Sequence, residues 1–214
     1  MVFDQNAWEH LPLRRVPRQA RSREKVAKAL AAADRIVRDQ GPDGLSLPQV
    51  AARAGVSVGA LYQYLPDRDA IVEAMVWRYH ARLEALLDKA IGAARRNPPG
   101  GDPIPFIIDS VAKIYREEES ARCLRGSADT AALAVQRRAH KERMAAKLAA
   151  LLEAVGVPTD DQSGRPVAQV AFAAADAVLH EAFARPEPVR SALLAELGLL
   201  MGRYLRPPSA AASA

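Results

Sequence analysis

A long amphipathic segment that ends at a strong break is the feature that most constrains the fold of this chain. From about Asp67 to Arg95, apolar side chains recur at helical spacing along one stripe, made of Ile71, Met75, Tyr79, Leu83, Leu86, Leu87 and Ala90. The Asn-Pro-Pro-Gly-Gly run at 97–101 then stops any helix. At about 1.5 Å per residue, a helix over this segment is roughly 40 Å long, so it can reach from one end of the molecule to the other.

The rest of the chain is also predicted to be helical. It has 214 residues, of which 50% are hydrophobic, enough for a real core, and only 5% are aromatic. Ala, Leu and Arg dominate, a composition that favours helices over strands. No alternation typical of strands and no sequence repeat is present. We therefore expect an all-α protein of about nine helices, at 21–39, 47–54, 58–64, 67–95, 102–118, 120–125, 129–155, 167–185 and 188–206.

The composition excludes several classes of protein. With a single cysteine, Cys123, the chain has no internal disulfide framework. No run approaches ~18 uninterrupted apolar residues, and the most apolar segment, 167–184, is interrupted by Gln169, Asp176 and His180. The first residues carry no apolar signal segment. We expect a soluble, cytoplasmic protein without a membrane partner.

The sequence also lacks the signatures of enzymes and metalloproteins. Its four histidines have no His or Cys partner at ligand spacing, and no Cys-x2-Cys pair, Gly-rich phosphate loop or Gly-x-Ser-x-Gly turn occurs. We expect no metal, no cofactor and no enzymatic activity. Cys123 is expected to be a small buried apolar group, with redox sensing as the alternative.

Positive charge is concentrated near the N-terminus. The whole chain carries a net charge of +5, whereas residues 10–28 hold seven basic residues and one acid. The remainder is therefore close to neutral. The segment is either a solvated tail or a surface for an anionic partner.

Residues 45–75 contain two short helices separated by a tight glycine turn. Ser46 and Ser57 are placed to cap these helices, and Gly55 is placed to end the first in a left-handed conformation. Such a pair is an ordinary helical hairpin or a helix-turn-helix, in which the second helix enters the DNA major groove. The exposed face of the second helix would consist of Ser57, Val58, Ala60, Tyr62, Gln63 and Tyr64.

Residues 21–75 resemble the TetR family of bacterial transcriptional regulators. The basic helix, the glycine break at 41–44, the stretch VAARAGVSVGALYQYLPDRDAI and the long following helix stand in that family's order. The resemblance implies a three-helix DNA-binding head, an all-helical effector domain and a homodimer. It further implies a repressor that leaves a palindromic double-stranded operator when a small molecule binds.

The resemblance also assigns roles to residues of the head. Ser46 would meet the DNA backbone, Tyr62 and Arg68 would contact phosphates, and Gln63 would face the bases. Arg21, Arg23 and Lys25 would lie near the backbone. Val58 and Ala60 stand where the family often has polar residues, and they could pack on a thymine methyl.

The implied organisation divides the chain into four parts. These are a basic flexible arm at 1–20, the helix-turn-helix domain at 21–66, the effector-binding and dimerisation domain at 67–206, and a frayed tail at 207–214. Within the third part, 67–95 links the domains and 167–206 forms a dimerisation hairpin. The arm is hypothesised to bind phosphates or the minor groove through Arg14, Arg15 and Arg18.

The effector and the partner copy are expected to contact the second domain. The predicted effector pocket is lined by Trp77, Tyr79, Phe106, Ile107, Ile114, Tyr115, Cys123, His140 and Phe172. For any one of these residues a plain core position is the alternative. The last two helices are apolar on two faces, so the predicted dimer interface comprises Val170, Ala174, Val178, Phe183, Leu193, Leu197, Leu200, Met201 and Tyr204.

Two rival functions stay open from the sequence. A helical small-molecule carrier or enzyme would bind a metabolite without salt-dependent affinity for DNA. An architectural DNA-binding protein would bind DNA without regard to its sequence. Basic residues at 137, 138, 141 and 147 on the 129–155 helix are expected to be solvated, or alternatively to favour an anionic effector.

Overall fold

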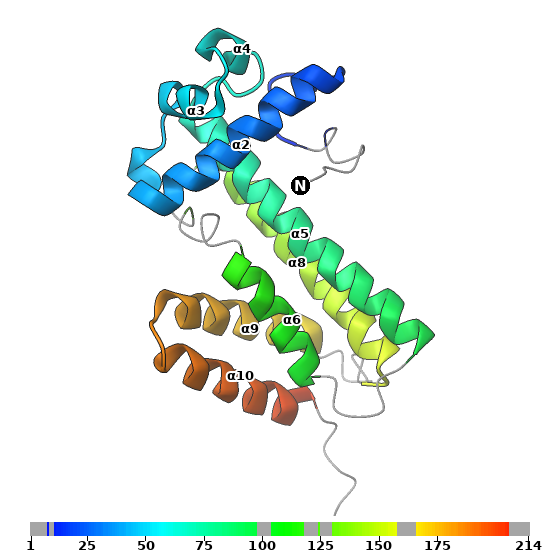
Figure 1. Ribbon diagram of the computed structural model, residues 1–214. Coiled ribbons are helices and arrows are strands. Elements are labelled where there is room, and N and C mark those ends of the chain that lie inside the picture. The colour runs from blue at the N-terminus through cyan, green and yellow to red at the C-terminus, as the bar shows by residue number, and fades with distance from the viewer. Residues whose placement is uncertain are drawn as a thin grey trace, which may run out of the picture. The chain divides into compact units, whose positions relative to one another are not determined.

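Eight α-helices and one 3₁₀ turn make up the described part of the computed structural model (Figure 1). The structure describes residues 8, 11–97, 104–117, 124, 130–157 and 166–205, with the side chains of Phe106, Ser110, Ile114 and Glu117 excepted. Within these residues there is no strand, so the all-α prediction is confirmed. Of the predicted helix at 120–125 only Leu124 is described, and the tail at 207–214 and Cys123 lie outside the described residues.

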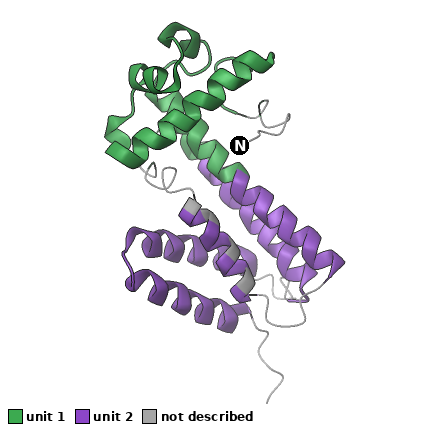
Figure 2. Cartoon of the chain, in the orientation of Figure 1, with its two compact units in different colours: residues 1–81, 118–136 green, residues 82–117, 137–214 purple. Residues whose placement is uncertain are grey.

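The chain forms two compact units (Figure 2). Unit 1 comprises residues 1–81 and 118–136, and unit 2 comprises residues 82–117 and 137–214. The long helix α5 (Arg68–Arg96) contributes to both units. The first turns of α5 bury Ile71, Val72 and Met75 in the core of the head. The head therefore extends beyond the predicted limit at residue 66.

In unit 1, the core is built around α2 (Ala20–Gln40). The predicted stripe of Val26, Leu30, Ala33 and Val37 is buried, together with Ile36. After Gly41, whose φ of 76° is left-handed, the 3₁₀ turn η1 (Pro42–Gly44) leads to α3 (Leu47–Ala54) and α4 (Val58–Tyr62). These two short helices lie against α2 and against each other.

Unit 1 also takes in residues far along the chain. Leu124 and Leu133, the latter in the first turn of α8 (Ala131–Ala154), are fully buried in the same core as α2. The hydroxyl of Thr130 donates a 2.6 Å hydrogen bond to Glu73 of α5 and accepts one from the Leu133 amide. The head core therefore includes part of the sequence that was assigned to the effector domain.

Unit 2 consists of α6 (Ile104–Glu117), α9 (Val167–Ala184), α10 (Val189–Leu205) and the adjoining parts of α5 and α8. α9 and α10 form a hairpin, and α6 contacts both helices. The stretches of α5 and α8 in this unit run side by side in the same direction. Glu84 meets His140 and Arg143, and Asp88 further along meets Lys147.

Candidate nucleic-acid interface

Local capping positions the two short helices of the head. The Ser46 hydroxyl accepts the Gln49 amide at 3.4 Å, and the Ser57 hydroxyl accepts the Ala60 amide at 3.2 Å. Gly55 has φ 65° and ψ 35°, the left-handed conformation that ends α3. All three sequence predictions are confirmed. The caps satisfy amides that a short helix otherwise leaves unpaired.

The helix α4 and the residues that flank it carry six of the eleven predicted DNA-binding residues. Leu61 is buried and holds the helix on the core, while Val58 is 43% and Tyr62 50% exposed. Ser57 and Gln63 are exposed too, whereas Ala60 and Tyr64 are half-buried. The helix ends at Tyr62, two residues earlier than predicted. A capped helix with a polar and aromatic outer face can enter a DNA groove.

The other predicted head residues occupy two places. Arg68 is half-buried, and its guanidinium donates to the Pro42 carbonyl at 3.2 Å, so it braces the turn before α3. Arg21, Arg23 and Lys25 lie in the first turns of α2. Of these three, Arg21 is the exposed one.

The segment before α2 was predicted to be a flexible arm, but its described residues pack against the head. Trp8 and Leu11 are each only 4% exposed and belong to the head core, and Pro17 is buried. The Arg14 amide donates to the Tyr64 carbonyl at 3.0 Å. The Arg14 guanidinium lies over the Tyr62 ring, 5.5 Å from its centroid. The signal in the sequence was the pair of large apolar residues, Trp8 and Leu11, next to the basic residues.

A buried ion pair connects α5 to α2 within unit 1. The Arg78 guanidinium donates to the Asp34 carboxylate, and Arg78 is only 6% exposed. The two residues are 44 positions apart. Sequence reasoning did not identify this pair, because nothing local indicates which acid a basic residue will meet.

The predicted effector residues fall in both units. Trp77 and Tyr79 belong to unit 1, and Ile107, Tyr115, His140 and Phe172 belong to unit 2. Cys123 and the side chains of Phe106 and Ile114 lie outside what the structure describes. The effector pocket therefore stays a prediction.

Two polar members of that set, Tyr115 and His140, already have partners. The buried Tyr115 hydroxyl donates to Asp176 at 3.1 Å and lies 3.1 Å from the His180 Nδ1. The His140 Nδ1 lies 2.8 Å from the Glu84 Oε1, and the Arg143 guanidinium donates to both carboxylate oxygens. Burial opposes the ionisation of Glu84, but these hydrogen bonds and charges outweigh it and lower its pKa to about 2.

The basic face of α8 is only partly solvated. Lys147 is bonded to Asp88, and the Lys141 ammonium lies 3.8 Å from Asp176. Arg138 is exposed.

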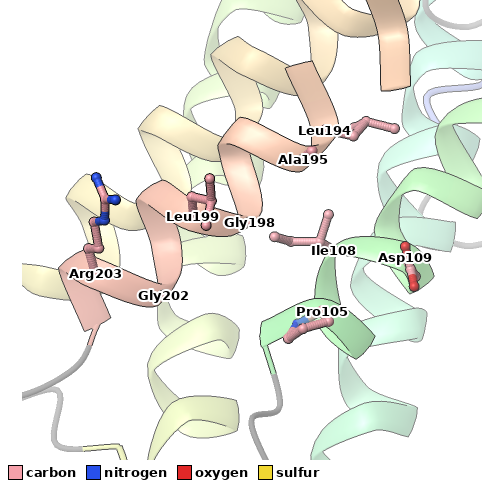
Figure 3. A pocket seen from close by; sticks show the side chains of 9 residues that line it. All are labelled: Pro105, Ile108, Asp109, Leu194, Ala195, Gly198, Leu199, Gly202 and Arg203. Atoms are coloured by element: carbon pink, nitrogen blue, oxygen red, sulfur yellow. The ribbon is translucent and has the colours of Figure 1, made fainter. Parts of the chain in front are cut away.

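A groove of about 470 Å³ lies between α6 and α10 (Figure 3). Ile108 reaches from α6 toward Gly198 of α10, and Asp109 and Arg203 stand on opposite sides of the view. The lining is completed by Pro105, Leu194, Ala195, Leu199 and Gly202. None of the predicted pocket residues lines this groove.

The predicted dimer residues divide by burial. Phe183, Leu197 and Met201 are buried in the core of unit 2. Val170 and Leu200 are 46% and 47% exposed, and Leu199, not predicted, is 53% exposed. The rest of the set, Ala174, Val178, Leu193 and Tyr204, is half-buried.

Within the described residues, no group of three or more His, Cys, Asp or Glu side chains is placed to hold a metal ion. By length and composition, α9 is apolar enough to cross a membrane, with 28% of it buried within the protein. One such helix is weak support for a membrane span, because helices of soluble proteins meet the same criteria.

The fold and the exposed α4 define a helix-turn-helix DNA-binding protein. Residues 29–75 match the family profile described as bacterial regulatory proteins of the tetR family, and residues 104–205 match the tetracyclin repressor-like C-terminal domain. The chain belongs to the TetR family of bacterial transcriptional regulators, whose members are DNA-binding proteins rather than enzymes. No curated protein sequence matches it.

Solved structures share the fold at low sequence identity. A putative TetR-family regulator from Mesorhizobium loti MAFF303099 is 18% identical, with a TM-score of 0.66, covering 87% of this chain and 98% of its own. SmeT in complex with triclosan is 18% identical, with a TM-score of 0.60, covering 89% and 98%. The multidrug binding protein EbrR, complexed with imidazole, is 20% identical, with a TM-score of 0.58, covering 86% and 96%.

Proposed function

We propose that two copies of this chain bind a palindromic operator, each placing α4 in the major groove. The observation that carries the proposal is the capped helix α4, which buries Leu61 and turns Val58 and Tyr62 outward, with the exposed Gln63 directly after it. Tyr62 would contact a phosphate, and the Gln63 amide would read a base edge. Val58 can pack on a thymine methyl.

The dimer would form through the α9–α10 hairpin. Both helices are largely apolar, yet Val170, Leu199 and Leu200 remain about half exposed on a single protomer. Apolar surface of this kind is typical of a protein interface. A two-fold dimer holds its recognition helices one DNA turn apart, about 34–36 Å, which is the spacing that two half-sites require.

A small molecule bound in unit 2 would release this cytoplasmic repressor from its operator. SmeT and EbrR, which share the fold, hold triclosan and imidazole. The volume of the α6–α10 groove lies within the range of small-molecule sites, which makes it a second candidate position beside the predicted pocket residues. Release requires that the ligand bind the two arrangements of the heads with unequal affinity.

The test is binding of the purified protein to the DNA that flanks its own gene, compared with scrambled DNA of equal length across a salt series. Preference for the flanking DNA at physiological salt supports a specific regulator. Tyr62→Ala should weaken binding to both DNAs, by about 1 kcal/mol or more, while Gln63→Ala should reduce the preference between them.

Other outcomes contradict the proposal. Equal affinity of the wild-type protein for both DNAs favours the architectural alternative. Absence of binding at low salt overturns the assignment of α4 as a recognition helix. If Gln63→Ala weakens both DNAs equally, Gln63 does not read bases.

A further inference from the structure

The segment that precedes α2 is held in place at both of its ends. Trp8 and Leu11 lie in the head core, and Leu13 packs against it. The Leu13 amide donates to the Leu11 carbonyl at 2.7 Å, which makes a tight three-residue turn. At the other end, the Arg23 Nε donates to the Pro17 carbonyl at 3.1 Å. The backbone between these anchors is therefore short and held at both ends.

These anchors bring Arg14 to the recognition helix. Its amide is bonded to the carbonyl of Tyr64, just beyond the end of α4. Its guanidinium lies 5.5 Å from the centroid of the Tyr62 ring, within the range of a cation–π contact. Tyr62 is itself half exposed, so the pair forms part of the outer surface of the head.

The exposed side chains of the segment are mostly basic, which indicates an anionic partner. Arg14, Arg15 and Arg18 are exposed, and Arg21 continues the exposed basic series into α2. Residues 11–28 carry seven basic side chains and one acid. A duplex whose major groove receives α4 presents phosphates beside that helix, and its charge complements this surface.

We propose that residues 11–18 are a preordered DNA-contact arm, in which Arg14, stacked on Tyr62, binds a backbone phosphate next to the groove that α4 enters. The inference rests on the proposed docking of α4. Because the structure already holds the arm in place, DNA binding does not have to order it, and its cations contribute without that entropic cost. Phosphate contacts made by the arm add affinity for any sequence.

The experiment measures the affinity of the full chain for a mixed-sequence duplex of about 30 base pairs across a salt series. The variants are Arg14→Ala and, as a control with the same change of charge, Arg185→Ala. Arg185 is exposed in unit 2 and pairs with Glu181, also exposed. Arg14→Ala should weaken binding on the order of tenfold at about 0.1 M salt and reduce the slope of log K against log salt by about 1 per arm. Arg185→Ala should leave the slope unchanged.

A second variant separates charge from stacking. Arg14→Lys keeps the charge but loses the planar guanidinium, so it should retain the wild-type slope with lower affinity. If Arg14→Ala behaves like Arg185→Ala, Arg14 binds no phosphate and the proposal is wrong. If it lowers affinity with an unchanged slope, Arg14 only supports Tyr62 and the proposed phosphate contact is wrong. If the wild-type chain binds no duplex, the proposed function itself fails.

Discussion

Neutralising Glu84 should destabilise unit 2 strongly at neutral pH and much less in acid. The Glu84 side chain, 17% exposed, accepts hydrogen bonds from His140 and from two nitrogens of Arg143. Its pKa is lowered from 4.5 to about 2, against the effect of burial. At about 1.4 kcal/mol per pKa unit, this shift corresponds to about 3 kcal/mol. Because Arg143 is half exposed and screened by solvent, we expect Glu84→Gln to cost about 2 kcal/mol.

The direction of the pH dependence follows from the lowered pKa. A carboxyl group whose pKa is lower in the folded state stabilises that state fully above its unfolded pKa, here 4.5. The stabilisation is lost as the pH falls from there toward about 2. The difference in unfolding free energy between wild type and Glu84→Gln should therefore shrink across this acid range.

Urea unfolding at about pH 7, 5 and 3 measures the effect. The protein concentration is kept fixed, because the stability of a dimer depends on concentration. Glu181→Gln is the matched control, because Glu181 forms an exposed i,i+4 pair with Arg185 and should contribute less than about 0.5 kcal/mol. The reasoning is refuted if Glu84→Gln costs no more than the control at neutral pH. It is refuted as well if the cost is the same at about pH 3 as at about pH 7.

Three further predictions concern the head and the dimer surface. Gly55→Ala should lower stability by about 1 kcal/mol, because φ is 65° at this position and an L side chain disfavours that conformation. The added Cβ meets nothing within 4 Å, so no steric clash adds to this cost, and an unchanged melting temperature would contradict the prediction. Asp34→Ala should cost about 3–5 kcal/mol in denaturant unfolding, since it leaves the buried Arg78 guanidinium without this carboxylate. Leu200→Asp should shift the protein toward monomer in sedimentation experiments, and a stable dimer would exclude this face from the interface.

The helix boundaries of the head could be predicted because they depend on neighbouring residues. A hydroxyl at Ser46 or Ser57 caps a helix through an amide three positions on, and Gly55 adopts a left-handed conformation that other residues disfavour. The prediction of where α4 ends was less accurate. The predicted helix continued to Tyr64, whereas the regular helix stops at Tyr62.

Candidate DNA contacts could be predicted from the sequence on α4 and on the basic arm, but the ordered position of the arm could not. Basic residues and prolines suggested a flexible tail, and the sequence could not show that Trp8 and Leu11 find space in the head core. The contact of Arg14 with Tyr62 follows from that burial. Two residues 48 positions apart meet here only because the core between them has formed.

The same distinction holds for the rest of the molecule. Helix type, caps and breaks are determined within a few residues, so the sequence alone is sufficient to predict them. When a helix is apolar on two faces, as α10 is, its periodicity does not say which face turns inward. Only packing against α6 and α9 buries Leu197 and Met201 and leaves Leu200 exposed. The partners of Asp34 and Glu84, 44 to 59 positions away, are likewise decided by how whole helices pack together.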